Sequence, residues 1–212
     1  MEIVKQIADK VIEGNPAEVT SLTKEAVKQK VAVRKIMDEG FIPGLDMVGD
    51  KYTNGEFFLP EMLMAGMAVK AGIEILRPLL TKFGVKPKGT IVAGTVLGDI
   101  HDIGKNIVCM MSEGAGFRVI DVGVDVPAEK FISAARANSA DIISMSALLS
   151  TTRANMEGII QAIRASELNY KIKVMIGGAP VTQDFADSIG ADGYAPDAGL
   201  AVKKAKELLG VA

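Results

Sequence analysis

The second half of the sequence alternates five times between a short β-rich run and a helical stretch, and this alternation constrains the fold most. The β-rich runs are Thr90–Gly94, Arg118–Val122, Asp141–Ser146, Lys173–Ile176 and Asp192–Ala195. The helical stretches are Lys105–Gly114, Ala128–Asn138, Arg153–Ser166, Thr182–Ile189 and Ala198–Leu209. This alternation predicts a five-stranded open parallel sheet with helices on both faces, an α/β fold. Right-handed crossovers favour a Rossmann-like (flavodoxin-like) strand order, whose ligands bind between the loops after the first and third strands.

The first half has helical periodicity throughout. Asn15 followed by Pro16 is typical of a helix start, and Gly40 is expected to end the apolar stripe that follows. The four predicted helices are Ile3–Ile12, one from Asn15-Pro16 to Gly40, Pro43–Tyr52, and one from Pro60 to about Phe83. They suit a four-helix bundle. The sequence therefore predicts a helical domain at 1–84, a linker at 85–89 and the α/β domain at 90–212.

Composition excludes several classes of protein. Twenty-four basic and 26 acidic side chains give a formal charge of −2, so no basic excess is available to neutralise nucleic-acid phosphates. The one cysteine, Cys109, excludes an internal disulfide framework and a cysteine-rich zinc site. No apolar run approaches the ~20 residues of a membrane span, and Met1–Lys10 lacks the order of a signal peptide. We expect a cytoplasmic protein that binds neither nucleic acid nor membrane.

The only histidine, His101, lies in the loop after the first predicted strand. Asp99 is close enough to accept one ring N–H, which fixes the tautomer and raises the basicity of the other nitrogen. Gly104 allows a tight turn or a close approach of the backbone to a ligand. One histidine cannot build a zinc site, but it can supply one axial ligand to a metal held by a macrocycle. The alternative is a partly buried histidine with no ligand role.

Three short motifs follow three predicted strands in order: Asp99-Ile-His-Asp-Ile-Gly104, Ser146-Ala-Leu148 and Gly177-Gly178. Together they resemble the binding signature of cobalamin (corrinoid) modules. The resemblance implies that His101 replaces the cofactor's own benzimidazole as the lower cobalt ligand. It also implies that the displaced nucleotide tail enters a slot in the Rossmann-like domain. The implied cofactor is cobalamin or a related corrinoid, used as methylcobalamin and as Co(I) cobalamin.

Other residues near these motifs have physical reasons to contact a cofactor. The Ser146 hydroxyl, at the end of the third predicted strand, can bond a heteroaromatic nitrogen, whereas helix capping suits Ser150 or Thr152 better. Gly177 and Gly178 leave a wall without side chains for a flat ring, with an ordinary turn as the alternative. In the similar methionine synthase modules a hydroxyl completes a His-Asp-Ser relay, at the position of Thr152. The predicted cofactor-binding residues of this domain are Gly98, Asp99, Asp102, Gly104, Ser146, Leu148, Ser150, Thr152, Gly177 and Gly178.

The segment from Tyr52 to Met62, Tyr-Thr-Asn-Gly-Glu-Phe-Phe-Leu-Pro-Glu-Met, resembles the helical cap of cobalamin-dependent methyltransferases. The resemblance implies that Tyr52, Leu59 and Met62 lie over the upper face of the corrin, where an apolar lid excludes water and oxygen. For Leu59 and Met62 the alternative is the core of the bundle.

The resemblance covers almost the whole chain and implies the corrinoid protein of a multi-component methyltransferase system. Such a protein accepts a methyl group on Co(I) from a substrate such as a methylamine, betaine, methanol or methoxylated aromatic, through a barrel-type substrate:corrinoid methyltransferase. It donates the group from methyl-Co(III) to tetrahydrofolate or coenzyme M through a second methyltransferase, and a reductive activase is a further expected partner. A carrier of this kind does not turn over alone.

Two other functions share the cobalamin domain. One is a subunit of an adenosylcobalamin-dependent mutase, against which the apolar segment around Leu59-Pro60 argues. The other is a cobalamin-sensing regulator, which needs a basic DNA-binding element that the sequence does not display. A flavodoxin-like nucleotide or phosphate domain is disfavoured because no Gly-x-Gly-x-x-Gly or Walker loop follows the first strand. The sequence does not identify the methyl donor, the methyl acceptor, the lower base of the free corrinoid or the oligomeric state.

Overall fold

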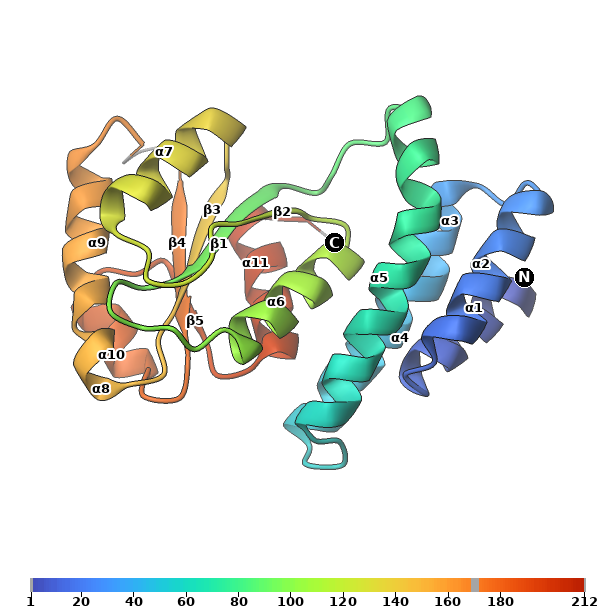
Figure 1. Cartoon of the computed structure of the whole chain (residues 1–212), viewed down its shortest axis with the longest axis horizontal. Coiled ribbons are helices and arrows are strands. Elements are labelled where there is room, and N and C mark those ends of the chain that lie inside the picture. Colours follow the sequence, from blue (N-terminus) through green and yellow to red (C-terminus); the bar gives the residue numbers. More distant parts are fainter. Residues whose placement is uncertain (1, 169–171, 212) are drawn as a thin grey trace. The chain divides into compact units, whose positions relative to one another are not determined.

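The computed structural model describes residues 2–168 and 172–211. The chain divides into two compact units (Figure 1). One comprises Met1–Pro87 with Met110–Gly116, and the other comprises Lys88–Cys109 with Phe117–Ala212. Within the described residues, no helix is both long and apolar enough to cross a membrane.

The second unit is built on a parallel sheet whose strands follow the order β2-β1-β3-β4-β5. The strands are β1 (Thr90–Thr95), β2 (Arg118–Asp121), β3 (Ile142–Ser146), β4 (Lys173–Gly177) and β5 (Gly193–Ala195). Every residue of the interior strand β1 is buried, whereas the edge strand β2 exposes Arg118 and Asp121. This order confirms the predicted flavodoxin-like topology and places the switch point between β1 and β3.

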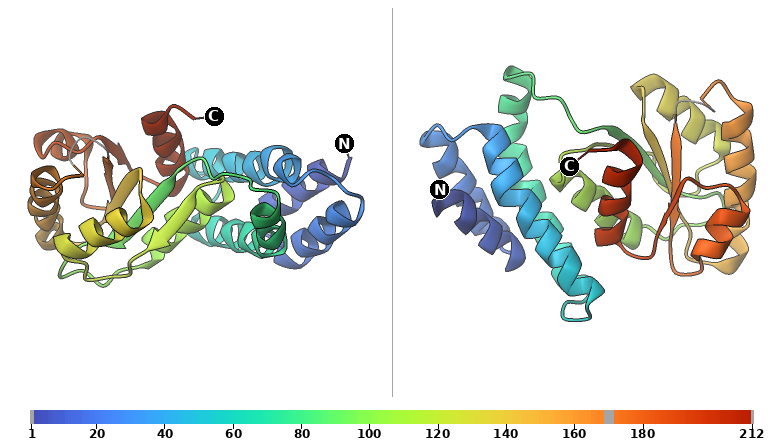
Figure 2. Two further views of the ribbon diagram at one scale, coloured as in Figure 1. Left: turned by 90° about the horizontal axis from the view of Figure 1, so that it is seen from above. Right: turned by 180° about the vertical axis from the view of Figure 1, so that it is seen from behind.

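Helices cover both faces of this sheet, as Figures 1 and 2 show. The helices that follow β1 along the chain are α6 (Ile103–Gly114), α7 (Ala128–Asn138), α8 (Ser150–Arg153), α9 (Asn155–Ala165), α10 (Gln183–Ser188) and α11 (Ala198–Leu209). The ranges predicted for α7 and α11 are confirmed. The single helix predicted over Arg153–Ser166 is wrong at its start, because the helical turn begins at Ser150 and a separate helix follows from Asn155.

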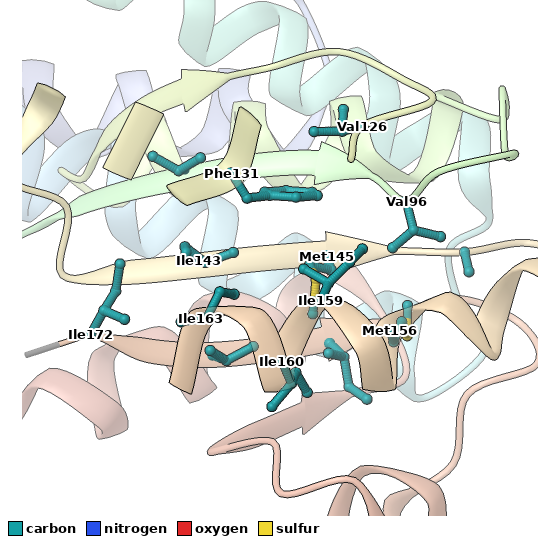
Figure 3. Packing of buried hydrophobic residues seen from close by; sticks show 14 of the residues in the cluster. Val96, Val126, Phe131, Ile143, Met145, Met156, Ile159, Ile160, Ile163 and Ile172 are labelled. Carbon is teal, nitrogen blue, oxygen red and sulfur yellow. The ribbon is translucent and has the colours of Figure 1, made fainter. Parts of the chain in front are cut away.

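A continuous apolar core fills the space between the sheet and helices α7 and α9 (Figure 3). Phe131 on α7, Met145 on β3 and Ile160 on α9 belong to this cluster, and each is at most 2% exposed. Burying side chains of this size stabilises the fold by about 1.5–3 kcal/mol each. The core therefore holds the carboxyl ends of β1 and β3 in fixed register.

The first unit is helical. Its elements are α1 (Glu2–Ile12), α2 (Pro16–Lys28), α3 (Val33–Ile36), the π-helical turn η1 (Met37–Phe41), α4 (Ile42–Thr53) and α5 (Leu59–Lys82). Because α3, η1 and α4 are continuous, residues 2–82 form four helical segments. Asn15 caps α2 as predicted, since its side-chain oxygen accepts from the Glu18 amide at 3.1 Å. Gly44 allows α1 to pack closely on α4, because a Cβ there would lie 2.8 Å from Val11 Cβ.

The predicted boundaries around Gly40 are wrong. Helix α2 ends at Lys28, and Lys30 adopts a left-handed backbone with φ of 59°. The amide of Val31 bonds the carbonyl of Ala26 at 3.0 Å, which is a Schellman termination formed without glycine. Gly40 lies inside the π-helical turn, so the next helix runs through it.

Candidate functional site

The loops after β1 and β3 lie at the switch point of the sheet. Thr95 and Ser146, the last residues of these strands, are paired in register. We call residues 96–102 the histidine loop and residues 147–149 the β3 loop. Both follow the carboxyl ends of central strands, where parallel sheets bind their ligands.

Asp99 connects the two loops. Its side chain is fully buried, and its Oδ2 accepts from the Leu148 amide at 2.8 Å in the β3 loop. Its Oδ1 accepts from the His101 amide at 3.0 Å and lies 2.7 Å from His101 Nδ1. Burial alone raises the pKa of Asp99, but the hydroxyl of Thr152 and the donors from Leu148 and His101 outweigh burial and hold it well below its ordinary value. The group is therefore a carboxylate at neutral pH.

His101 is oriented by this carboxylate. Because Asp99 can only accept, Nδ1 of the neutral ring carries the hydrogen and Nε2 has a free lone pair. The side chain of His101 is 46% exposed, so the ring lies at the surface of the unit. The pair therefore presents one basic imidazole nitrogen backed by a buried anion, which is the arrangement of a metal-bound histidine.

Thr152 completes a chain of three side chains. Its Oγ1 donates to Asp99 Oδ2 at 2.6 Å and is also 3.0 Å from the Leu149 carbonyl. The short helix α8 brings this buried hydroxyl beneath Asp99. The structure therefore assembles His101, Asp99 and Thr152, with threonine at the position where the resembling modules have serine.

Asp125 supports the histidine loop from a third loop, between β2 and α7, and was not predicted. Its Oδ1 accepts from the Gly98 amide at 2.7 Å, and its own amide donates to the Asp99 carbonyl at 2.9 Å. Its backbone is left-handed, with φ of 53°. An aspartate in this strained region that is bonded twice to one loop is typical of a positioning residue. The sequence signal was the Gly-x-Asp turn at the same edge of the sheet.

The remaining predicted residues lie around this group. Asp102, Gly104 and Ser150 are exposed, and Asp102 Oδ2 accepts from Asn106 at 3.0 Å. Of the two roles expected for Gly104, the tight turn is wrong, because the residue lies in the first turn of α6. The close approach to a ligand stays a prediction, and a Cβ added at Gly104 would meet nothing within 4 Å. Ser146 Oγ lies 3.1 Å from Thr95 Oγ1. Among the described residues, no group of three or more His, Cys, Asp or Glu side chains could hold a metal ion.

Gly177 and Gly178 are needed by the backbone itself. A Cβ on Gly178, whose φ is 120°, would lie 1.9 Å from the Ala147 carbonyl oxygen, and one on Gly177 would lie 2.9 Å from that of Ala195. Any side chain at Gly178 would push the β3 loop away from β4. The close approach of backbone segments therefore accounts for both glycines before any ligand is considered.

Comparison with known proteins identifies the family. A B12-binding domain model matches residues 89–203, and a second B12-binding domain model matches residues 3–77. The chain belongs to the B12-binding family of corrinoid proteins. It is 40% identical to a corrinoid protein of Desulfitobacterium hafniense strain Y51, over 99% of both chains. It is also 43% identical to the dimethylamine corrinoid protein of Methanosarcina barkeri, over 98% of both chains.

Solved structures agree with this assignment. A cobalamin-binding protein from Desulfitobacterium hafniense DCB-2 matches with a TM-score of 0.82 at 28% identity, over 97% of this chain and 98% of that one. A chain of the methanol:cobalamin methyltransferase complex MtaBC from Methanosarcina barkeri also matches with a TM-score of 0.82. Its identity is 30%, over 100% of this chain and 81% of that one. The Rossmann-like fold and the cobalamin or corrinoid cofactor expected from the sequence are thereby confirmed.

The residues at the switch point fit a corrinoid. The donor set is one imidazole, which suits a metal whose other positions a macrocycle fills. The two loops also expose large apolar side chains around His101, of which Ile100 is 74% exposed. The exposed apolar residues of these loops and the start of α6 are Leu97, Ile100, Ile103, Leu148 and Leu149. Apolar surface gathered around a polar donor is typical of a site for a large, mostly apolar ligand.

The three cap residues expected from the sequence lie in the helical unit. Tyr52 is partly buried near the end of α4, and Leu59 begins α5 with 45% of its surface exposed. Met62 is 1% exposed, which is what the bundle-core alternative predicts.

We predict that Asp125 tunes corrinoid binding through the Gly98 amide. Asp125→Gly keeps the left-handed backbone but removes the carboxylate, whereas Asp125→Asn keeps an acceptor oxygen and tolerates the same backbone. Losing one hydrogen bond should weaken hydroxocobalamin binding about 5-fold in the glycine variant, measured as Kd by absorbance titration. The asparagine variant should stay within about 2-fold of wild type. Equal affinity of all three proteins would show that this bond does not position the loop.

Proposed function

We propose that this corrinoid protein carries a methyl group between two partner methyltransferases and that His101 is the lower axial ligand of its cobalt. The observation that carries the proposal is the 2.7 Å contact between His101 Nδ1 and the buried Asp99, which leaves Nε2 available at the switch point. When bound, the corrinoid supplies a cobalt centre that takes up a methyl group as Co(I) and releases it from methyl-Co(III).

The chain's own residues tune and shield this site. Asp99 holds the hydrogen on His101 Nδ1 and stabilises positive charge on the ring, which strengthens donation from Nε2. Thr152 Oγ1 donates to Oδ2, the carboxylate oxygen of Asp99 that does not face His101 Nδ1, and so fixes the orientation of the carboxylate. We assign cap roles to Tyr52 and Leu59 within residues 1–84, where apolar cover excludes water from the reactive centre, and we assign the buried Met62 to the core of the bundle. Partner access then requires the cap to open and close.

The proposed methyl donor is a methylated amine. Dimethylamine and trimethylamine corrinoid proteins of Methanosarcina are 40–43% identical to this chain over 98% of its length. The proposed partners are a barrel-type methyltransferase for the amine and a second methyltransferase for tetrahydrofolate or coenzyme M. A reductive activase and a cytoplasmic location complete the proposal. Support for partner binding comes from the match to a chain of a methyltransferase complex.

Methyl loading tests the carrier role. The purified chain is mixed with hydroxocobalamin, reduced with titanium(III) citrate, treated with carbon-13 methyl iodide in the dark and passed through a gel-filtration column. We expect about one light-labile labelled methyl group per chain to elute with the protein, and unreduced protein to carry no light-labile label. A chain that retains no cobalamin would contradict the proposal. Retained cobalamin without a stable methyl label would favour the mutase alternative.

A further inference from the structure

Thr95 connects two parts of the site and has no role in the proposal above. It is the last residue of β1 and is fully buried. Its hydroxyl donates to the carbonyl oxygen of His101 at 2.9 Å, and Ser146 Oγ lies 3.1 Å from it on β3. Its backbone is also fixed, because its amide donates to the Gly123 carbonyl and its carbonyl accepts from the Val126 amide, both at 3.0 Å. These bonds hold the backbone of Thr95 in place, so its hydroxyl stays within reach of both neighbours.

The number of hydrogens in this group is limited. A hydroxyl has one hydrogen and a carbonyl oxygen has none, so the Thr95 hydrogen must point to His101 O. In the bond between the two hydroxyls, Ser146 is then the donor and Thr95 Oγ1 is the acceptor. In this arrangement the only hydroxyl hydrogen of Ser146 is used in the bond to Thr95. It can accept further bonds but cannot donate to a ligand.

We propose that Thr95 is a positioning residue that couples the Ser146 hydroxyl to the loop that carries His101. If Ser146 turns its hydrogen to an acceptor nitrogen on a ligand, one of the two bonds at Thr95 is lost. If Thr95 still donates to the His101 carbonyl, no hydrogen is left between the Thr95 and Ser146 hydroxyl oxygens. If Thr95 instead donates to Ser146, the His101 carbonyl loses its donor. The inference rests on the proposed function and on the binding mode expected from the sequence, in which a nitrogen of the cofactor's nucleotide tail accepts from Ser146.

The coupling has a predictable sign. In wild type, donation from Ser146 to the tail costs one internal hydrogen bond, so the tail adds less affinity than it otherwise would. In Thr95→Val, Ser146 has no competing acceptor at residue 95, and the tail should contribute more. The His101 carbonyl lacks its donor whether or not a tail is present, so that loss cancels when two ligands are compared. Because coupling is reciprocal, ligation by His101 should also respond to the tail.

The experiment compares hydroxocobalamin with aquocobinamide, which has the same ring and metal but no nucleotide tail. Absorbance titration gives Kd for each ligand, and the ratio of cobinamide Kd to cobalamin Kd measures the contribution of the tail. We expect this ratio to rise about 5-fold in Thr95→Val, the scale of one hydrogen bond. Thr95→Ser keeps the hydroxyl and should match wild type. In a Ser146→Ala background, Thr95→Val should leave the ratio unchanged.

An unchanged ratio in Thr95→Val would overturn the inference, because Thr95 would then only support the loop. Circular dichroism of the free protein checks that the variant folds. If valine prevents folding, Thr95→Cys, which is smaller and whose thiol is only a weak donor and acceptor, should change the ratio in the same direction. Failure of the proposed binding mode is a different result: Ser146→Ala alone would then leave the ratio at its wild-type value, and loss of His101 ligation would appear as a wild-type spectrum without imidazole-bound cobalamin.

Discussion

His101→Ala is expected to abolish imidazole ligation of bound cobalamin and to weaken binding by roughly 100-fold. The weakening should be at least that of losing an outer-shell partner, about 10–100-fold, because the ligand itself is removed. The visible spectrum of wild type loaded with hydroxocobalamin should show the lower benzimidazole displaced by histidine. The variant should give a spectrum without a protein nitrogen on the metal.

Rescue by free imidazole separates ligation from indirect damage. The side chain of His101 is 46% exposed, and Asp99 keeps its other donors in the variant. The free energy of unfolding of the free variant should therefore lie within about 0.5 kcal/mol of the wild-type value. Millimolar imidazole should then restore the wild-type spectrum in His101→Ala and leave wild type unchanged. Identical spectra for wild type and variant without imidazole would remove His101 from the ligand role.

Asp99→Ala is expected to lower the free energy of unfolding of the free protein by about 3 kcal/mol, because it leaves the Leu148 and His101 amides without their acceptor. It should also weaken hydroxocobalamin binding by about 10–100-fold, since the ring loses its orienting partner. Urea unfolding followed by circular dichroism measures the first effect, and absorbance titration measures the second.

Thr152→Val is the matched control for Asp99→Ala, because it removes one donor to the same carboxylate and keeps the side-chain volume. We expect it to cost about 1 kcal/mol, since Asp99 retains the backbone donors. The double variant should lose less stability than the sum of the two single variants, as groups in one network do. Additive losses, or a loss below about 0.5 kcal/mol for Asp99→Ala, would show that this carboxylate does not join the loops.

The sheet could be predicted from the sequence because its signals are local. Each strand is a short β-rich run and each helix a periodic stretch, and the ends of α7 and α11 coincide with the predicted ones. The helical half was harder at one point, because the stop after α2 carries no glycine or proline, whereas Gly14, Gly55 and Gly84 follow α1, α4 and α5. Lys30 ends α2 by adopting a left-handed backbone, and Gly40 lies inside a helix where packing outweighs its low propensity.

The motifs located the site, but the supporting bonds depend on tertiary structure. The sequence places Asp99 two residues from His101, and the hydroxyl of Thr152 reaches Asp99 only because α8 begins directly after the β3 loop. Asp125 and Thr95 were missed. The signal for Thr95 was present, however, because two neighbouring strands each end in a hydroxyl residue, and parallel pairing sets such ends side by side.

That the chain has one histidine makes this site directly observable by magnetic resonance. Labelling with nitrogen-15 histidine would give signals from a single imidazole, the one whose Nδ1 faces Asp99 and whose Nε2 is free. The chemical shifts of those two nitrogens would distinguish the tautomers and report any metal bond in one unmodified sample. Loading, methylation and partner docking could therefore be followed in a mixture of several enzymes without altering the protein.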